Sequence, residues 1–224
     1  LDTMLGKQVD GIVMMSDHVT DKLASAIRQS PVPVVLAGSI INDSSIPSVN
    51  IDYFQAAMDA IQLFINKGHK EIAFVSGPLE YTINGEHKLG AYKQALQQAN
   101  IEINDQLIDA TDGTYDEALL SWESFVQKAH VPTAIFAGSD EIALGVIHAI
   151  QDAGKRVPED VEVISFENSK LARMIRPQLT SVALPLYDIG AVSMRLLTKL
   201  LNKEEVPDKN VILPYRIETR KSTK

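Results

Sequence analysis

Hydrophobic residues fall along the chain in two alternating patterns, short unbroken runs and longer stretches with helical spacing. The short runs are rich in Val, Ile, Ala and Phe, and each is followed by glycine or a polar residue, as is typical of strands buried in a parallel sheet. The longer stretches repeat apolar residues every three or four positions, which predicts helices. The clearest strands span residues 9–15, 31–37, 71–76, 133–137 and 161–166, and the clearest helices span residues 20–30, 52–67, 84–99, 115–128 and 139–154.

Strands and helices therefore alternate along most of the sequence. Each strand–helix pair takes roughly 25–35 residues, as βαβ units do. This order predicts an α/β protein with parallel sheets and helices on both faces. Residues 39–48 are rich in Asn, Asp, Ser and Pro and are predicted to form turns.

Polar side chains follow the predicted strands at the edge where open parallel sheets bind their ligands. Asp140 and Glu141 also stand in the first turn of a predicted helix, where the helix dipole favours carboxylates. That explanation is favoured for Glu141, whereas for Asp140 a structural role and a role in the cleft stay equally open. The candidate cleft residues are Ser16, Asp17, Ser39, Ser76, Ser139, Asp140, Glu167 and Asn168.

Residues 185–203 predict an amphipathic helix. Asp188 is predicted to be its N-cap, because the carboxylate can accept hydrogen bonds from free backbone N–H groups of the first turn. Arg195, Lys199 and Lys203 recur at every fourth position and line one ridge. The residues predicted to face the core are Ile189, Val192, Leu196, Leu197, Leu200 and Leu201.

Charge is distributed unevenly along the 224 residues, whose net charge is −8. Residues 1–169 carry 10 basic and 24 acidic side chains, whereas residues 170–224 carry 11 basic and 5 acidic ones. An acidic chain is a poor nucleic-acid binder by itself, because neutralisation of phosphates drives such binding. The basic segment contains the ridge of residues 195, 199 and 203, and it indicates a localised anionic partner.

Few residues suggest catalysis or metal binding. The five histidines, at positions 18, 69, 87, 130 and 148, have no metal-ligand spacing, and there is no cysteine to form disulfides or thiolate sites. Phosphate-binding glycine loops and the nucleophile elbow of hydrolases are also missing. No apolar run approaches the ~18 residues of a membrane span. The chain is therefore predicted to be neither an enzyme nor a metal protein, to need no cofactor, and to lie in the cytoplasm.

Five stretches carry a family resemblance: Val9–Val13, Gly68–Pro78, Asp140–Gly145, Val157–Val161 and Ile164–Asn168. Taken together they resemble the core domain of the LacI/GalR bacterial transcription regulators, over essentially the whole chain. Residues 187–203 and 216–224 are similar to the subgroup of that family that controls carbon catabolism.

The resemblance implies two Rossmann-like subdomains joined by a multi-crossing hinge, as in type I periplasmic binding proteins. One would hold residues 1–50 and 184–212, incomplete at its start, and the other residues 51–183 and 213–224. It also implies a homodimer whose helix-turn-helix headpiece binds operator DNA. That headpiece is not within these residues, so the fragment itself is not expected to bind DNA specifically.

Family members sense sugars or purines in the cleft with an arginine and an aspartate. This sequence has Lys88 and Glu167 at those positions, and lysine lacks the planar fork with which arginine grips a ligand. The resemblance therefore assigns Ser16, Asp17, Ser76, Lys88, Asp140 and Glu167 to an effector cleft of secondary importance. Fructose 1,6-bisphosphate and glucose 6-phosphate are the secondary effectors that it implies.

The main signal implied by the subgroup is a protein, the phosphocarrier HPr phosphorylated on a serine. Carried onto this sequence, Arg195 and Lys199 would meet the phosphoserine, with Tyr187, Asp188 and Arg216 around them. A phosphoserine carries roughly −2 charge and three acceptor oxygens, which suits this basic ridge.

Two other functions stay open. An extracytoplasmic sugar-binding protein of a transporter shares the fold, although it would normally stack sugars on several aromatic residues, and only 6% of this chain is aromatic. A sugar-responsive repressor of the same family is the other alternative.

Overall fold

The computed structural model describes residues 1–41 and 43–224. Asn42, which belongs to the predicted turns at 39–48, lies outside the described residues. The chain forms two compact units: unit 1 holds Leu1–Asp52 and Pro185–Pro214, and unit 2 holds Tyr53–Leu184 and Tyr215–Lys224. The chain thus passes between the units three times, at places within two residues of the boundaries that the resemblance implies.

Unit 1 is built on a four-stranded sheet that is parallel throughout. One face of the sheet packs with residues of α2 (Asp21–Arg28) and the short α1 (Asp2–Leu5), and the other face packs against α8 (Leu186–Leu201). The strands, in spatial order, are β1 (Ile12–Met14), β2 (Val34–Ala37), β3 (Ser48–Asn50) and β9 (Asn210–Ile212).

Unit 2 is built on a six-stranded sheet in which only the edge strand β10 runs antiparallel to its neighbour. Its spatial order is β10 (Arg216–Glu218), β8 (Thr180–Ala183), β7 (Glu162–Glu167), β6 (Ala134–Ala137), β4 (Ile72–Ser76) and β5 (Ile108–Ala110).

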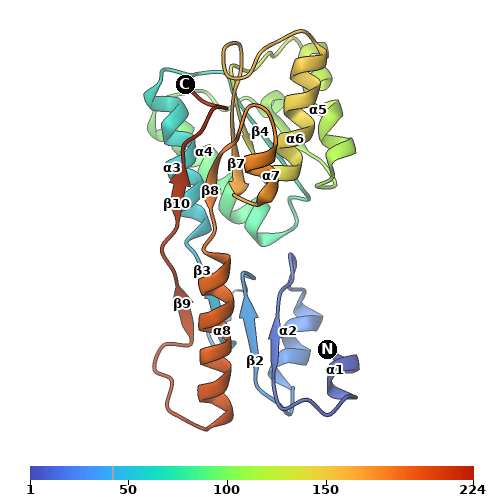
Figure 1. Ribbon diagram of the computed structural model, residues 1–224, viewed down its shortest axis with the longest axis vertical. Coiled ribbons are helices and arrows are strands. Elements are labelled where there is room, and N and C mark those ends of the chain that lie inside the picture. Colours follow the sequence, from blue (N-terminus) through green and yellow to red (C-terminus); the bar gives the residue numbers. More distant parts are fainter. Residues whose placement is uncertain (42) are drawn as a thin grey trace. The chain divides into compact units, whose positions relative to one another are not determined.

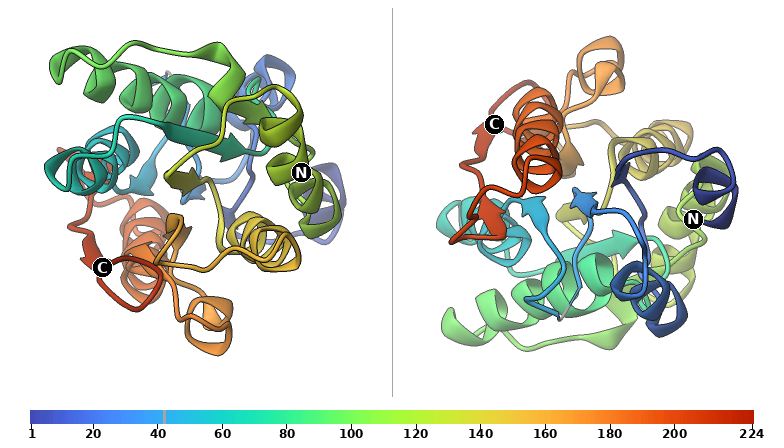
Figure 2. Two further views of the ribbon diagram at one scale, coloured as in Figure 1. Left: turned by 90° about the horizontal axis from the view of Figure 1, so that it is seen from above. Right: turned by 90° about the horizontal axis from the view of Figure 1, so that it is seen from below.

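Helices cover both faces of this sheet, as Figures 1 and 2 show. One face carries α3 (Tyr53–Asn66) and α4 (Gly90–Gln98), and the other carries α5 (Tyr115–Gln127), α6 (Asp140–Asp152) and α7 (Lys170–Met174). The predicted α/β class with parallel sheets in two subdomains is confirmed.

Hydroxyl side chains cap the N-termini of several of these helices by accepting a hydrogen bond from a free backbone N–H group of the first turn. Thr20 Oγ1 accepts from the N–H of Leu23 at the start of α2, and Ser139 Oγ accepts from the N–H of Ile142 at the start of α6. The Ser139 cap follows β6 after only Gly138, so α6 begins at the carboxyl edge of the sheet.

The turn after β2 is stabilised by a carboxylate. Asp43 Oδ1 accepts from the backbone N–H and hydroxyl of Ser45, and Asp43 Oδ2 accepts from Arg28 Nη1 at 2.6 Å. The Ser45 hydroxyl, followed by Arg28, lowers the pKa of Asp43 to about 2. This carboxylate therefore stays ionised until the solution is strongly acidic.

The structure departs from the sequence prediction in three segments. The helix predicted at 84–99 begins as a π-helical turn, η1 (Ile83–Leu89), before it continues as α4. The 3₁₀ turn η2 (Asp105–Leu107) and helix α7 were not predicted, because both are too short to show an apolar period. Gly85 lies in the π-helical turn, where a Cβ atom would be 2.0 Å from the carbonyl oxygen of Leu79.

Helices α5 and α6 approach each other closely at Gly145. A Cβ atom at this position would lie 2.6 Å from the Tyr115 carbonyl oxygen and 2.8 Å from the Ala118 Cβ atom. We expect Gly145→Ala to lower the free energy of unfolding by about 1–3 kcal/mol, the usual cost of overpacking. Urea denaturation checks this, with Gly154→Asn as a control, since nothing lies within 4 Å of a Cβ atom there and asparagine tolerates its positive φ. A loss at position 145 no larger than at 154 would contradict the prediction.

Candidate functional site

Helix α8 begins two residues earlier than the predicted N-cap. Pro185 precedes the helix, and the N–H of Ile189 already donates to the Pro185 carbonyl. The prediction that Asp188 is the N-cap is therefore wrong: its carboxylate lies in the first turn, where it meets the positive end of the helix dipole.

The core-facing side of α8 largely matches the predicted pattern. Ile189, Leu196 and Leu197 are buried against the sheet of unit 1, and Val192 and Leu200 pack against the same cluster. Leu201 was predicted to face the core, but it is 41% exposed. It lies about 100° around the helix from Leu200, which packs against the core cluster, and so falls at the edge of the core-facing side.

The outer side of α8 combines basic and apolar residues. Arg195 and Lys199 are exposed, as the predicted ridge requires. Tyr187 is 86% exposed and Met194 is 54% exposed. Residues 187, 191, 194, 195 and 198 follow the spacing of one helical face, and all of them are exposed. We call residues 187, 191, 194, 195, 198 and 199 the outer face of α8.

Met194 did not enter the sequence-based site, although a signal for it was available. An apolar residue at the position next to Arg195, on the polar side of the predicted helix, breaks the amphipathic pattern. Leu186, 51% exposed, is a second such residue. Large apolar side chains exposed together with charges are typical of protein contact surfaces.

Arg216 lies in β10, which belongs to unit 2, whereas α8 belongs to unit 1. Its side chain is exposed and pairs with Glu218 on the same strand. An exposed ion pair of this kind contributes little to the stability of the fold. The Arg216 guanidinium can therefore leave Glu218 and bind an anion that carries more charge.

The predicted cleft residues are divided between the units as well. Ser16 and Asp17 follow β1 in unit 1, where the Ser16 N–H donates to the hydroxyl of buried Ser39 at 2.8 Å. The other predicted cleft residues, from Ser76 to Asn168, all belong to unit 2.

Lys88 is buried within unit 2 at the carboxyl edge of the sheet. Its ammonium group donates to the Gly138 carbonyl at 2.7 Å and to Asn84 Oδ1 at 3.4 Å, and it lies 4.5 Å from the centre of the Phe166 ring. The π-helical turn η1 carries both Asn84 and Lys88. Beside Gly138, the buried Ser76 hydroxyl has no hydrogen-bond partner among the residues that the structure describes.

Asp140 is 1% exposed and is surrounded by hydrogen-bond donors. Its carboxylate accepts from the hydroxyls of Ser165 and Ser181, at 2.5 and 3.1 Å, and from the N–H of Ser169. These contacts join β7, β8 and the start of α7. The geometry therefore favours the structural role of Asp140 that the sequence left open.

Glu167 ends β7, and its side chain is exposed. Glu167 and Asn168 both have positive φ angles, 105° and 56°, although neither is glycine.

Among the described residues, no group of three or more histidine, aspartate or glutamate side chains is placed to hold a metal ion. Nor does any helix in residues 1–41 and 43–224 combine the length and apolar character of a membrane crossing.

Residues 61–223 match the periplasmic binding protein-like domain. The chain is 55% identical over all of its residues to catabolite control protein A of Priestia megaterium and 45% identical to that of Staphylococcus xylosus. It spans 68% and 67% of those relatives.

Solved structures agree with these relatives. The transcription regulator CcpA of Lactococcus lactis is 41% identical, with a TM-score of 0.92 over 100% of this chain and 81% of that one. The complex of the transcriptional regulator CelR with cellobiose is 30% identical, with a TM-score of 0.90 over 99% of this chain and 68% of that one. These similar proteins bear the names of transcription regulators rather than of enzymes or transporters.

Proposed function

Because the chain belongs to the LacI/GalR family and is the core of a carbon-catabolite transcription regulator, we propose that its corepressor is serine-phosphorylated HPr. The partner docks on the outer face of α8. Docking favours the state of the core in which a helix-turn-helix headpiece binds operator DNA. Coupling between two sites of this kind is typically worth about 1–3 kcal/mol.

The observation that carries the proposal is the composition of the outer face of α8. Arg195 and Lys199 stand one helical turn apart and are exposed, so a phosphate can meet both. Arginine can grip two phosphate oxygens, and lysine adds a point charge. Arg216 in unit 2 and Asp188 in the first turn of α8 complete the set of proposed contacts.

The exposed apolar residues supply the part of the binding free energy that ion pairs alone cannot. Two or three exposed ion pairs, at about 0.2–1 kcal/mol each, give about 1–3 kcal/mol, whereas micromolar binding needs about 8 kcal/mol. Full burial of a large apolar side chain is worth about 1.5–3 kcal/mol. Tyr187 and Met194 are exposed enough to make such contacts. The phosphate therefore selects the partner, and the apolar contacts hold it.

Titration of the chain with HPr and with serine-phosphorylated HPr tests the proposal. We expect the phosphorylated form to bind at least about tenfold more tightly, which corresponds to about 1.4 kcal/mol. Equal affinity for the two forms would refute the corepressor role.

The apolar part of the site has its own test. We expect Met194→Ala to weaken binding of both HPr forms by about the same factor, on the order of tenfold, because the methionine contacts protein and not phosphate. Met4→Ala is the matched control, since Met4 is 49% exposed in the same unit but lies on α1. Calorimetric titration of the unmodified chain and of both variants with each HPr form gives the six affinities; a loss confined to the phosphorylated form would contradict the assignment.

The remaining parts of the proposal concern the whole regulator. It acts as a cytoplasmic homodimer, and α7 presents apolar surface to a second copy, since Leu171 and Met174 are both exposed on this five-residue helix. Operator DNA is contacted only through a headpiece. Fructose 1,6-bisphosphate or glucose 6-phosphate binds as a secondary effector at the residues of the predicted cleft, and no other cofactor is required.

A sugar-responsive repressor is the second candidate, and the similarity to the CelR–cellobiose complex favours it. In that case a sugar, and not HPr, is the main ligand. The buried Lys88, which already donates to Gly138 and Asn84, argues against it. Titration with cellobiose separates the two candidates, because sub-micromolar affinity for a neutral sugar would support the second.

A further inference from the structure

The loop that follows β7 holds Glu167 in a conformation that glutamate disfavours. Glu167 has a φ of 105°, which residues with side chains rarely adopt, and the next residue, Asn168, has a φ of 56°, which asparagine tolerates better than most residues. Such a conformation persists only where the surrounding structure fixes it. The loop also carries Glu167, the carboxylate assigned to the effector cleft.

Two buried groups beneath the sheet edge hold the backbone of this loop. The Asn168 N–H donates to Ser181 Oγ at 3.0 Å, and the Ser169 N–H donates to the carboxylate of Asp140. Ser181 also donates to Asp140 at 3.1 Å, so the two anchors support each other. These two hydrogen bonds hold the backbone of the loop, whereas the Asn168 side chain is bound by a different residue.

That residue is Arg220, from the last segment of the chain. Its Nη2 atom donates to Asn168 Oδ1 at 2.6 Å, while Nη1 donates to the Leu179 carbonyl at 2.6 Å. The planar guanidinium thus connects the loop after β7 with the start of β8. Both hydrogen bonds are short, and the rigid guanidinium supplies them from two separate nitrogens, whereas a lysine would have to reach both acceptors from a single ammonium nitrogen.

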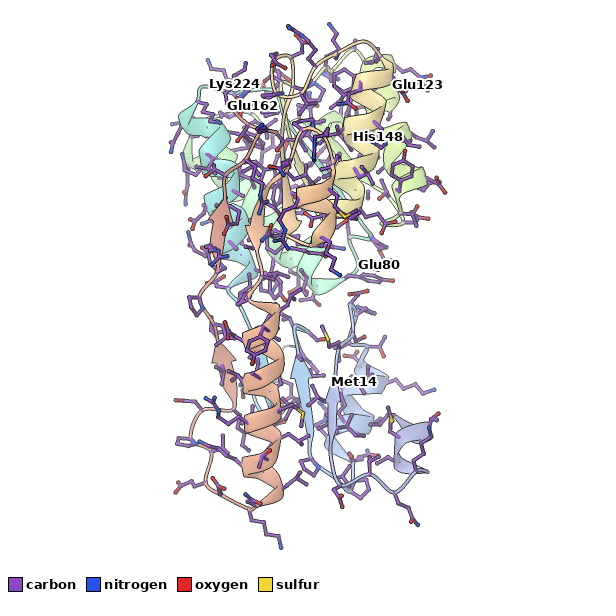
Figure 3. The ribbon with its side chains drawn as sticks, viewed as in Figure 1. Met14, Glu80, Glu123, His148, Glu162 and Lys224 are labelled. Atoms are coloured by element: carbon purple, nitrogen blue, oxygen red, sulfur yellow. The ribbon has the colours of Figure 1, made fainter. Side chains whose placement is uncertain are left out.

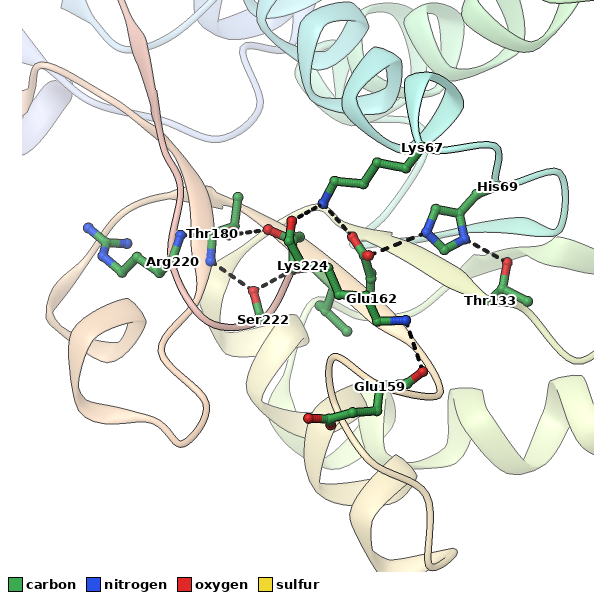
Figure 4. Close-up of polar contacts among 11 residues, drawn as sticks. Lys67, His69, Thr133, Glu159, Glu162, Thr180, Arg220, Ser222 and Lys224 are labelled. Atoms are coloured by element: carbon green, nitrogen blue, oxygen red, sulfur yellow. Dashed lines mark hydrogen bonds and ion pairs between the residues drawn. The ribbon is translucent and has the colours of Figure 1, made fainter.

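Arg220 is itself fixed on a well-anchored segment, shown in Figure 4. Its backbone N–H donates to Thr180 Oγ1 at 2.8 Å. Two residues later, the buried Ser222 hydroxyl accepts from the Thr180 N–H and donates to the Val163 carbonyl. At its end, the Lys224 carbonyl accepts from Lys67 Nζ at 2.6 Å. Lys67 also forms an ion pair with Glu162. Figure 3 labels Glu162 and Lys224.

The same segment begins with the proposed phosphate contact Arg216. In β10, Arg216 is paired with Ala183 of β8, and Ala183 is paired with Glu167 of β7. The two proposed site residues are therefore in register across three neighbouring strands. With strands about 4.8 Å apart, their backbones are roughly 10 Å apart.

We propose that Arg220 is the positioning residue of the effector cleft: through Asn168 it fixes the loop that presents Glu167. Because Arg220 and Arg216 share one short segment, the loop is tied to the strand that contacts the partner. The inference rests on the proposed function for the roles of Glu167 and Arg216. The holding of the loop itself depends only on the contacts within unit 2.

Amide hydrogen exchange, measured by NMR on the unliganded chain, tests the holding of the loop. We expect Arg220→Gln to speed exchange at Asn168 and Ser169 at least about tenfold, since local opening sets these rates. Lys221→Gln is the matched control, because Lys221 is the exposed neighbour of Arg220; it should leave both rates within about twofold.

Two further variants keep the test decisive if Arg220→Gln destabilises the whole chain. Asn168→Ala removes the acceptor and tolerates the positive φ less well, so it should speed exchange at Ser169 at least as much, whereas Asn168→Asp retains both an acceptor and tolerance of that φ and should preserve protection. Unchanged exchange in both Arg220→Gln and Asn168→Ala would overturn the proposal.

Fructose 1,6-bisphosphate serves as the probe of the cleft. We expect its affinity to fall about tenfold in Arg220→Gln, which corresponds to a loss of about 1.4 kcal/mol. In Lys221→Gln its affinity should stay unchanged. Equal probe affinity in both variants would overturn the positioning role. Failure of the unmodified chain to bind phosphorylated HPr would instead refute the proposed function, and the exchange rates would still decide whether Arg220 holds the loop.

Discussion

Arg195→Ala is expected to weaken binding of serine-phosphorylated HPr about 10- to 100-fold, while binding of unphosphorylated HPr changes less than about threefold. Once the docked partner shields it from water, a pair of arginine with phosphate is worth about 1.5–3 kcal/mol, the range for hydrogen bonds to charged groups. This is more than the roughly 0.2–1 kcal/mol of a pair that stays exposed. Arg195 is exposed on the outer face of α8, so its loss should not disturb the fold. The effect should therefore be confined to the form of the partner that carries phosphate.

Lys203→Ala is the matched control for this experiment. Lys203 continues the basic ridge by one turn, but it lies beyond the end of α8 with a positive φ of 57°. We expect it to change either affinity by less than about threefold. Equal losses for both HPr forms in Arg195→Ala would remove the phosphate from the assignment and make Arg195 a general contact.

Asp140→Ala is expected to lower the free energy of unfolding by about 2–4 kcal/mol. The substitution leaves the hydroxyls of Ser165 and Ser181 and the N–H of Ser169 without their acceptor. Leaving a buried donor unpaired costs about 1–3 kcal/mol, and relaxation of the hydroxyls recovers part of the sum. The loss should be measured by urea denaturation.

Glu141→Ala is the control, because Glu141 is the adjacent carboxylate in the first turn of α6 but is exposed. It should cost about 1 kcal/mol or less. Asp140→Asn should be intermediate, because the amide can keep the hydroxyl bonds but presents N–H to the Ser169 donor. If Asp140→Ala instead left stability intact and abolished only effector binding, Asp140 would belong to the cleft after all.

Local patterns predicted a large part of this molecule. Buried apolar runs marked the strands of both sheets, and apolar spacing marked α3, α5, α6 and α8. The exposed ridge of Arg195 and Lys199 also followed from spacing alone, because a helix places every fourth residue on one side. The resemblance then implied the two-unit organisation and the proposed partner, neither of which any local pattern contains.

Errors occurred where a competing local hydrogen bond decided the start of a helix, and where long-range contacts outweigh local preference. Asp188 has the chemistry of an N-cap, yet α8 starts at Leu186 because the backbone of Pro185 already accepts its first helical hydrogen bond. The π-helical turn at Ile83–Leu89 directs Lys88 toward Gly138, 50 residues away in the sequence. Helix α7 is only five residues long, and Asp140 and Ser169 hold its first turn.

The sequence by itself determined the α/β class, the basic outer face of α8 and the positions of the strand exits, because each depends on a period of a few residues. Only the tertiary structure decided that Asp140 is an internal anchor and that the Arg220 guanidinium donates to Asn168. Those roles depend on contacts between residues 25 to 52 positions apart, as in Asp140–Ser165 and Arg220–Asn168. Neither leaves a periodic trace in the sequence, since chain folding alone brings the groups together.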